Sequence, residues 1–333
     1  MAKMVQVKKK IALLHRHPEH RIKETNAAFP YLKAKGLDVL TFRDFPRTGN
    51  NWKFIKSILW IFYAPLLVWG RGYDVIYCDD SYPFYPALVK FFCPEAKVII
   101  RLGDLHLMYY YSGLTYKILH FFEKIAWRMV DGIIAISRQM QFYISKTKAC
   151  CLVLDPVDPK DFPMSGAKNE GTVMFHGLLT KNKDVDILLE AARRLPDVKF
   201  VIIGDGPDKK RLMRESPKNV YFKGWVPFKS IHRHIETCSV GVALRSDNPG
   251  NEYVVTSPFL QYGIMGKPCL VTRRKVFGTY YWQFKDVKDL VTALTVLINN
   301  PELAKQEGQI LREYILKNHD AEKVAEGIWK ILN

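Results

Sequence analysis

The chain has 333 residues, more than one compact hydrophobic core usually holds, so two domains are expected. Hydrophobic residues make up 48% and charged residues 25% of the sequence, which excludes a disordered or low-complexity chain. The formal net charge of +17 is typical of proteins that meet nucleic acid, anionic lipid or an anionic small substrate. Charge alone does not choose among these partners.

In chain order, the first half alternates apolar, β-branched runs with amphipathic stretches, a pattern typical of a parallel sheet with helices on both faces. The run IALL near the basic N-terminus is too short for a signal peptide, and no small-residue cleavage site follows it. It predicts a first strand instead. The runs that predict strands are 11–14, 38–42, 74–78, 97–102, 132–136 and 151–154. Residues 26–36, which end in Gly36, have the length of a crossover helix.

The pattern restarts after a stiff connector that contains Pro156, Pro159 and Pro163. Strands are predicted at 172–177, 199–204, 219–224, 239–244 and 268–272, with a helix near 185–195. We therefore expect two Rossmann-like, doubly wound α/β domains that face a cleft. We place an N-terminal domain at 1–155, a linker at 156–170, a C-terminal domain at 171–318, and a helix at 319–333 that returns to the N-terminal domain.

The six cysteines form no CxxC pair and have no histidine partners at metal-ligand spacing. Buried free thiols in a reducing cytoplasm fit this pattern best, and no metal site is expected.

Two stretches, 57–70 and 108–129, mix aromatic, apolar and basic residues. The first is too short to cross a membrane, which takes about 20 apolar residues. Both could be ordinary helices that pack on the sheet. They could also form an interfacial face that rests on anionic lipid, because Trp60 and Trp69 of the first stretch cluster with Lys53 and Lys56, which flank it.

The strongest local signal is VKFVIIGDGPDKKRL, a buried strand that ends in Gly204 and Gly206 before a helix. Glycines let the backbone approach a ligand closely, although any strand-to-helix turn can be rich in glycine.

The second half reads, in order, FHGLLTKNKDVDILLEAARRLPDVKFVIIGDGP, NVYFKGWVPF, CSVGVAL and TSPFLQYGIMGKPCLV. This order resembles the nucleotide-binding domain of GT-B glycosyltransferases, most closely the retaining family four (glycosyl transferases group 1). The segments VDGIIAISRQMQFYI and LDPVDPKDFP resemble the end of the family's N-terminal domain and its linker. The resemblance spans nearly the whole chain and implies a metal-independent hexosyltransferase whose donor is a nucleotide-diphosphate sugar.

The resemblance assigns Lys183 to the donor phosphates, but Leu178 stands where the family has an arginine. Lys181 and Arg245 are candidates to replace that arginine. Alternatively, Lys181 and Lys183 are only a pair of solvent-exposed charges in a loop. The cations would stabilise the leaving pyrophosphate.

Ser257 as N-cap, with Pro258 in the first turn, predicts a helix whose free N–H groups, beside Thr256, can bind phosphate. Simple capping is the alternative. The family brackets this helix with two carboxylates. The resemblance places the ribose-binding one at Gln261, which lacks the charge, and makes Glu252 the candidate carboxylate beside the donor sugar. It also places the nucleoside near Trp225 and Val226, with packing alone as the alternative for Trp225.

In the first half, Asp104 and His106 stand near the family's catalytic His-Asp position and are catalytic candidates, or only helix caps. The cations and imidazoles of the loop of His15, Arg16 and His17 suit an acidic or phosphate-bearing acceptor. Asp79 and Asp80 end another predicted strand, at the same carboxyl edge of the predicted sheet. There they could bind acceptor hydroxyls or cap the helix that follows.

The sequence thus predicts a cytoplasmic glycosyltransferase, peripheral on the inner face of the membrane. It would use a nucleotide sugar and a glycan or lipid-linked acceptor, and would not bind nucleic acid. An inverting GT-B enzyme, with Asp104 as general base, and a non-catalytic nucleotide- or glycan-binding relative remain alternatives, because Leu178 and Gln261 both depart from the family pattern.

Overall fold

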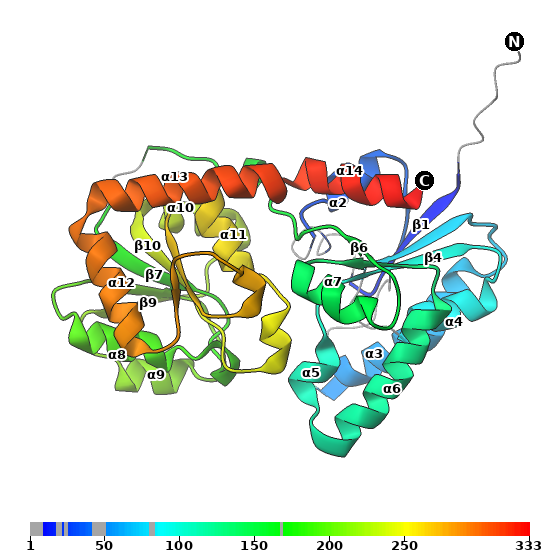
Figure 1. The fold of residues 1–333 in the computed structure, drawn as a ribbon, viewed down its shortest axis with the longest axis horizontal. Helices are drawn as coiled ribbons and strands as arrows, with labels where there is room; N and C mark the ends of the chain where they lie inside the picture. Colours follow the sequence, from blue (N-terminus) through cyan, green and yellow to red (C-terminus); the bar gives the residue numbers. More distant parts are fainter. Residues whose placement is uncertain (1–8, 18–21, 23–25, 42–50, 80–83, 167–168) are drawn as a thin grey trace, which may run out of the picture. The chain divides into compact units, whose positions relative to one another are not determined.

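The computed structural model describes residues 9–17, 22, 26–41, 51–79, 84–166 and 169–333, of which 51–58 by their backbone alone. The chain divides into two compact units, one of residues 1–156 with 321–333 and the other of 157–320 (Figure 1). Each unit is built on one six-stranded sheet, and every strand pair within the two sheets is parallel. The predicted fold class of two Rossmann-like α/β domains is confirmed.

The first unit has the strand order β2-β1-β3-β4-β5-β6. Its strands are β1 (Ile11–His15), β2 (Asp38–Thr41), β3 (Val75–Asp79), β4 (Lys97–Leu102), β5 (Gly132–Ala135) and β6 (Cys151–Leu152). Its helices are α2 (Phe29–Ala34), α3 (Asn51–Val68), α4 (Phe84–Phe92), α5 (His106–Tyr110), α6 (Gly113–Met129), α7 (Arg138–Ser145) and α14 (Ala321–Leu332).

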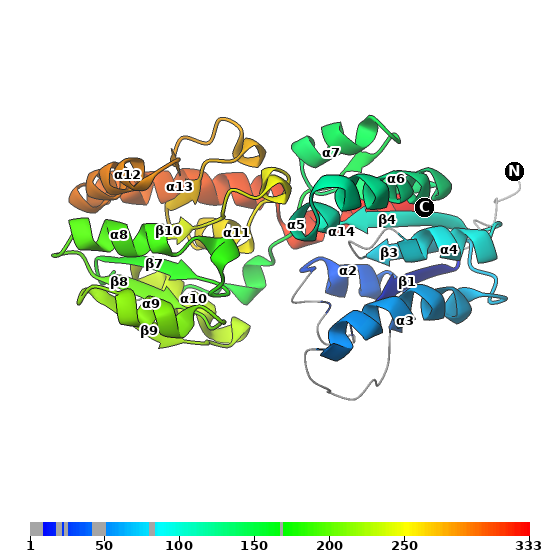
Figure 2. The same ribbon diagram turned by 90° about the horizontal axis from the view of Figure 1, so that it is seen from below.

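Helices α2 and α14 cover one face of this sheet, and α3, α4 and α6 lie on the other (Figure 1). The C-terminal helix α14 belongs to this unit because Ile328 and Leu332 are fully buried in the core that β1 and β3 share with α2. The predicted return of the last helix to the N-terminal domain is therefore confirmed. On the other face α4 lies between α3 and α6 (Figure 2).

The second unit has the strand order β12-β11-β10-β7-β8-β9. Its strands are β7 (Thr172–His176), β8 (Phe200–Ile203), β9 (Val220–Gly224), β10 (Cys238–Ala243), β11 (Cys269–Thr272) and β12 (Gln283–Phe284). Its helices are α8 (Asp186–Arg194), α9 (Lys209–Glu215), α10 (Phe228–Thr237), α11 (Ser257–Ile264), α12 (Val287–Asn299) and α13 (Pro301–Asn318).

Alternate strand residues of this sheet point to opposite faces, as the pleat requires. Val173 and Phe175 of β7 enter the core with α8, α9 and α12, while Met174 enters the core with α10, α11 and α13. Both faces are therefore buried, which is why these strands read as continuous apolar runs.

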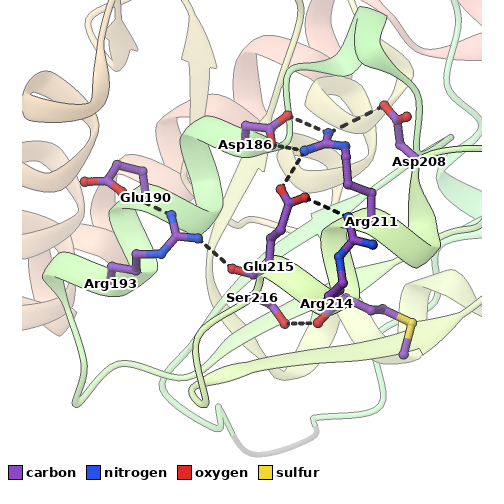
Figure 3. A network of polar contacts seen from close by, with 9 residues as sticks. Asp186, Glu190, Arg193, Asp208, Arg211, Arg214, Glu215 and Ser216 are labelled. Carbon is purple, nitrogen blue, oxygen red and sulfur yellow. Dashed lines mark hydrogen bonds and ion pairs between the residues drawn. The ribbon is translucent and has the colours of Figure 1, made fainter.

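Arg211 holds α8 and α9 together at the surface (Figure 3). Its Nη1 and Nη2 atoms lie 2.6 and 2.9 Å from the two carboxylate oxygens of Asp186, and Nη1 also lies 2.9 Å from Glu215. A bidentate arginine–carboxylate pair fixes relative orientation better than a single contact does. This pair therefore fixes the start of α8 against α9, and each helix follows a loop at the edge described below.

The cysteine prediction is correct in part. All six cysteines are free, and Cys78, Cys238 and Cys269 are buried, but Cys151 is exposed. Cys151 lies on the two-residue edge strand β6, which the sequence pattern had taken for a longer buried run.

Candidate functional site

The strand order of the second unit puts a topological switch point at the carboxyl end of its sheet. Strands β7 and β10 are neighbours, with β8 and β9 to one side and β11 and β12 to the other. The connections that leave β7 and β10 turn in opposite directions, and α/β sheets bind ligands at such a switch point. The loop after β7 carries Lys181 and Lys183, and the loop after β10 carries Arg245.

Hydrogen bonds join these two loops. Ser246 donates from N and from Oγ to Asn182, at 3.0 and 2.7 Å. Asn251 donates from Nδ2 to the carbonyl oxygen of Ser246 at 2.9 Å. The turn of Lys181 and Lys183 and the short 3-10 helix Pro249–Glu252 are therefore fixed through the loop that carries Arg245.

Two glycines set how closely the loops after β7 and β8 approach each other. A Cβ on Gly204 would lie 1.9 Å from the carbonyl oxygen of Gly177, and one on Gly206 would lie 2.3 Å from that of Leu179. Both glycines have positive φ, at 149° and 157°. They serve this contact between loops, and their predicted contact with a ligand stays a prediction.

His176, the last residue of β7, was missed at the sequence level. It is 8% exposed, and its ring packs edge-on against Tyr262 with centroids 5.0 Å apart. Within the described part of the chain its Nε2 atom is buried without a hydrogen-bond partner. Burial, with the charge of Lys183 as a second cause, lowers the pKa of His176 to about 3. A neutral imidazole with a free nitrogen therefore lies close to Lys183.

The same edge holds two more buried polar atoms without hydrogen-bond partners among the described residues, Arg245 Nε and Asn251 Oδ1. Native proteins rarely leave such atoms unsatisfied, and where they do, an ion, water or ligand is the usual partner. His176 could have been noticed in the sequence in the same way as Arg245, because each is a polar residue directly after an apolar run, in TVMFH and SVGVALR.

The N-cap of α11 is Thr256, so the prediction of Ser257 was wrong. Thr256 has extended backbone angles, and its side chain accepts from the N–H of Phe259 at 3.4 Å. Ser257 is the first helical residue and is exposed. Both residue types cap helices well, so only the backbone conformation decides between them.

Gln261 lies on α11, one turn beyond this cap, and is half-buried. No hydrogen bond of its side chain is found among the described residues, so the amide is available to a ligand. Glu252 Oε2 accepts from the N–H of Lys275 at 2.8 Å, and Glu252 Oε1 lies 3.9 Å from Arg274 Nε. Glu252 is thus oriented by the loop after β11, a contact that the sequence did not predict.

Trp225 follows β9 with its side chain 69% exposed, so packing into the core does not explain it. Val226 is partly buried and packs against the core under α10 and α11. Leu178, which stands where the family has an arginine, is 59% exposed.

In the first unit, β1 and β3 are neighbours at the corresponding switch point. His15 ends β1 and is 4% exposed, with Nδ1 accepting from the N–H of His17 at 3.0 Å. Asp79 ends β3 and is 5% exposed. Asp80 lies outside the described residues.

Asp79 takes part in a buried ion pair that the sequence did not predict. Arg101 of β4 donates from Nη1 to Asp79 at 3.1 Å and from Nη2 to Asp155. Asn26 Nδ2 donates to the other oxygen of Asp79 at 2.5 Å. Both carboxylate oxygens of Asp79 therefore accept hydrogen bonds from protein donors.

Asp104 lies between β4 and α5. His106 is the first residue of α5 and stacks on Tyr110 with centroids 6.1 Å apart. Burial and the neighbouring charge of Arg16 lower the pKa of His106 to about 4. Burial raises the pKa of Asp155 to about 6, with the charges of Asp104 and Asp79 acting in the same direction and Arg101 against it. His106 and Arg16 are therefore neighbours, as are Asp104 and Asp155.

A search of the described residues found no group of three or more His, Cys, Asp or Glu side chains able to hold a metal ion.

The pKa of His176 gives a test. The folded protein keeps this ring neutral down to about pH 3, whereas the unfolded chain protonates near pH 6.5. Stability is therefore lost as the pH falls below 6.5, by up to roughly 3 kcal/mol at pH 4.5. We expect His176→Phe to lose fewer degrees of melting temperature than the parent between pH 7.5 and 4.5. Equal losses in a thermal-shift measurement would contradict the buried, neutral histidine.

Known proteins resemble the chain in two ways. Residues 170–300 match the family model described as glycosyl transferases group 1. No curated protein sequence matches. Solved structures match over nearly the whole chain. HepE from Anabaena, in complex with UDP and glucose, is 15% identical with a TM-score of 0.72, over 98% of this chain and 99% of that chain.

Two further solved structures are similar to the chain over nearly its whole length. Sucrose-phosphate synthase from Thermosynechococcus elongatus is 14% identical with a TM-score of 0.77, over 97% and 98% of the two chains. The lipopolysaccharide outer core galactosyltransferase WaaB is 14% identical with a TM-score of 0.64, over 97% and 100%. At these identities the likeness shows the fold. The chain therefore has the GT-B fold predicted from its sequence, and its residues 170–300 match the family model of glycosyl transferases group 1.

Proposed function

We propose that the protein transfers a hexosyl group from a nucleotide-diphosphate sugar to an acceptor, with retention of the anomeric configuration. One observation carries the proposal. A domain that matches the glycosyl transferases group 1 model presents, at the switch point of its sheet, lysines and an arginine beside buried polar atoms that have no hydrogen-bond partner among the described residues. The retaining outcome follows from the family resemblance.

The chemistry of the donor explains this arrangement. Breaking the glycosidic bond releases a nucleoside diphosphate, so the site must stabilise developing negative charge on the leaving phosphate. Lys183, Arg245 and the N-terminal N–H groups of α11 offer that stabilisation without a metal. His176 Nε2 and Asn251 Oδ1 would gain hydrogen-bond partners from the same ligand. The relative HepE was crystallised with UDP and glucose, which supports a nucleoside diphosphate as the leaving group.

We assign the remaining candidate residues to different parts of the donor and to the acceptor. We assign Glu252 to the donor sugar, with Asp104 and His106 as further catalytic candidates, and Thr256, Ser257 and Lys181 to the phosphates. Gln261, Trp225 and Val226, with Gly204 and Gly206, would hold the nucleoside. His15, Arg16, His17 and Asp79 would serve the acceptor.

We expect Lys183→Ala to lower kcat/KM for sugar transfer by roughly 100- to 1,000-fold, because one phosphate-stabilising cation is lost from the transition state. Lys305→Ala removes the same charge from the exposed side of α13, and should leave transfer unchanged. A Lys183→Ala enzyme within twofold of the parent would remove Lys183 from the site.

We further propose that the enzyme is peripheral on an anionic membrane and that its acceptor is lipid-linked. The described helices include none that is long and apolar enough to span a bilayer. An interfacial face needs exposed apolar side chains with basic residues among them. Helix α6 has both. Exposed apolar side chains follow one side of it at helical spacing: Leu114, Ile118, Phe121, Phe122, Ile125 and Met129.

Charge supports the choice of a membrane over a protein partner. Lys117 and Arg128 are exposed on α6, and its one acidic residue, Glu123, is 4% exposed and bonded to His120. The exposed side of α6 therefore carries positive charge only, which suits an anionic surface.

The apolar surface continues onto the neighbouring helices. Trp69, just after α3, is 61% exposed and packs near Phe92 of α4, with centroids 6.3 Å apart. Trp60 does not belong to this surface, because it is 2% exposed and packs against Tyr85, so that part of the sequence prediction was wrong. The side chains of Lys53 and Lys56 lie outside the described residues.

The protein should co-sediment with vesicles of phosphatidylglycerol and phosphatidylcholine at low salt, and less with pure phosphatidylcholine. The double variant Phe121→Ser/Phe122→Ser should weaken binding at least tenfold, because burying one Phe side chain contributes about 1.5–3 kcal/mol. Ile310→Ser, at an equally exposed apolar position on α13, should bind like the parent. Equal binding by the double variant would show that α6 does not contact lipid.

A further inference from the structure

A basic pocket lies at the carboxyl end of β11, beside the donor site described above. Its volume is about 550 Å³, and three cations and one carboxylate line it together with aromatic and amide side chains. The charged members are Arg273, Arg274, Lys275 and Glu252, and the uncharged ones with polar side chains are Thr279, Tyr280, Tyr281 and Gln283.

The position of the pocket follows from the strand order. Five neighbouring strands each deliver one candidate group to the carboxyl edge. In the order of the sheet these are Trp225 after β9, Gly204 after β8, Lys183 after β7, Arg245 after β10 and Arg274 after β11. Neighbouring strands are about 4.8 Å apart, so these groups form a row across the edge. If the proposed function holds, a donor laid along this row with its nucleoside at β8 and β9 and its phosphates at β7 and β10 would put its sugar at β11.

Arg274 is the unusual member of the pocket. Its side chain is only 12% exposed, yet its hydrogen bonds go to backbone carbonyls, from Nη1 to Arg273 at 2.9 Å and from Nη2 to Arg245 at 3.1 Å. The carboxylate oxygens of Asp247 and Glu252 lie 3.7 and 3.9 Å away, too far for a hydrogen bond. Its Nε atom is buried without a hydrogen-bond partner among the described residues.

A buried guanidinium is costly unless an anion is hydrogen-bonded to it. Glu252 is not hydrogen-bonded to it, because Oε1 lies 3.9 Å from Arg274 Nε while Oε2 accepts from the N–H of Lys275 at 2.8 Å. Arginine is the side chain that best matches a planar carboxylate, to which it can donate two parallel hydrogen bonds. Three cations and one carboxylate line the pocket, so it carries an excess of positive charge, and Arg274 Nε still has a hydrogen bond to donate. The pocket therefore has both the charge and the donor to hold a carboxylate.

We propose that this pocket binds the carboxylate of an acidic donor sugar, so that the donor is a nucleoside diphosphate hexuronate. Arg274 pairs with the carboxylate, and the exposed Arg273 and Lys275 draw the acidic sugar to the pocket. This inference rests on the proposed function and adds the charge class of the sugar to it.

The test uses the full-length protein and isothermal titration calorimetry. UDP, GDP and ADP are titrated first to find the base that binds. The hexuronate and neutral hexose donors of that base, for example UDP-glucuronate and UDP-glucose, are then compared. We expect the hexuronate to bind about 10- to 100-fold more tightly than the hexose, the range of a hydrogen-bonded charge pair. Arg274→Gln should abolish this preference and leave the affinity for the nucleoside diphosphate within twofold of the parent.

Lys288→Gln, an exposed charge on α12, is the matched control and should keep the preference. Equal affinities for the two donors in the parent would overturn the inference while leaving the proposed function intact. So would an Arg274→Gln protein that loses affinity for the nucleoside diphosphate alone, because Arg274 would then be a phosphate ligand. If no nucleoside diphosphate binds, the proposed function falls and the inference with it.

Discussion

Every strand pair within the two sheets is parallel, and this constraint decides where the chemistry of the molecule can be. Parallel strands deliver all the loops that follow them to one edge of the sheet, and the reversal of strand order opens a gap between the helices there. In the second unit that edge collects lysines, an arginine, a histidine and the N-terminus of α11, although these groups are up to about 80 residues apart in the chain. The loops can meet so closely only because Gly204 and Gly206 have no Cβ.

The two edges use buried charge in opposite ways. In the first unit Arg101 is 3% exposed and is paired with Asp79 and Asp155, so its charge is neutralised inside the protein. In the second unit the Arg274 side chain is 12% exposed, and the carboxylates of Asp247 and Glu252 stay beyond hydrogen-bond distance. A buried polar group without a partner destabilises the free protein, and a ligand that hydrogen-bonds to it removes that cost. That contrast favours the second unit as the place where an anionic ligand is held.

The sequence predicted most of the fold because the buried strands are long, β-branched and bounded by turn residues. The prediction missed β12, since Gln283 and Phe284 make too short a run to recognise. It could not separate Trp60 from Trp69, which lie in one aromatic stretch, because only packing turns Trp60 towards Tyr85 and leaves Trp69 exposed. Thr256 and Ser257 are both good capping residues, and the backbone angles that distinguish them are set by the loop from β10.

Candidate site residues that belong to a sequence motif could be predicted from the sequence. Those that stand out only because they are buried beside particular neighbours could not. Lys183 and Gln261 were proposed from the order of the motifs, and their roles stay predictions. His176, Arg101 and Arg274 were missed because each is an ordinary residue type, whose interest comes from being buried beside particular neighbours. A polar residue at the end of an apolar strand could have drawn attention to the first two, since such residues reach the carboxyl edge.

Sugar transfer itself is the central claim, and it is tested most directly by turnover with the UDP, GDP and ADP sugars, followed by the anomeric configuration of the product. The account predicts turnover with sugars of one base and a product that keeps the anomeric configuration of the donor. Nucleotide binding without turnover of any donor would contradict an enzymatic role, and an inverted product would contradict the retaining mechanism.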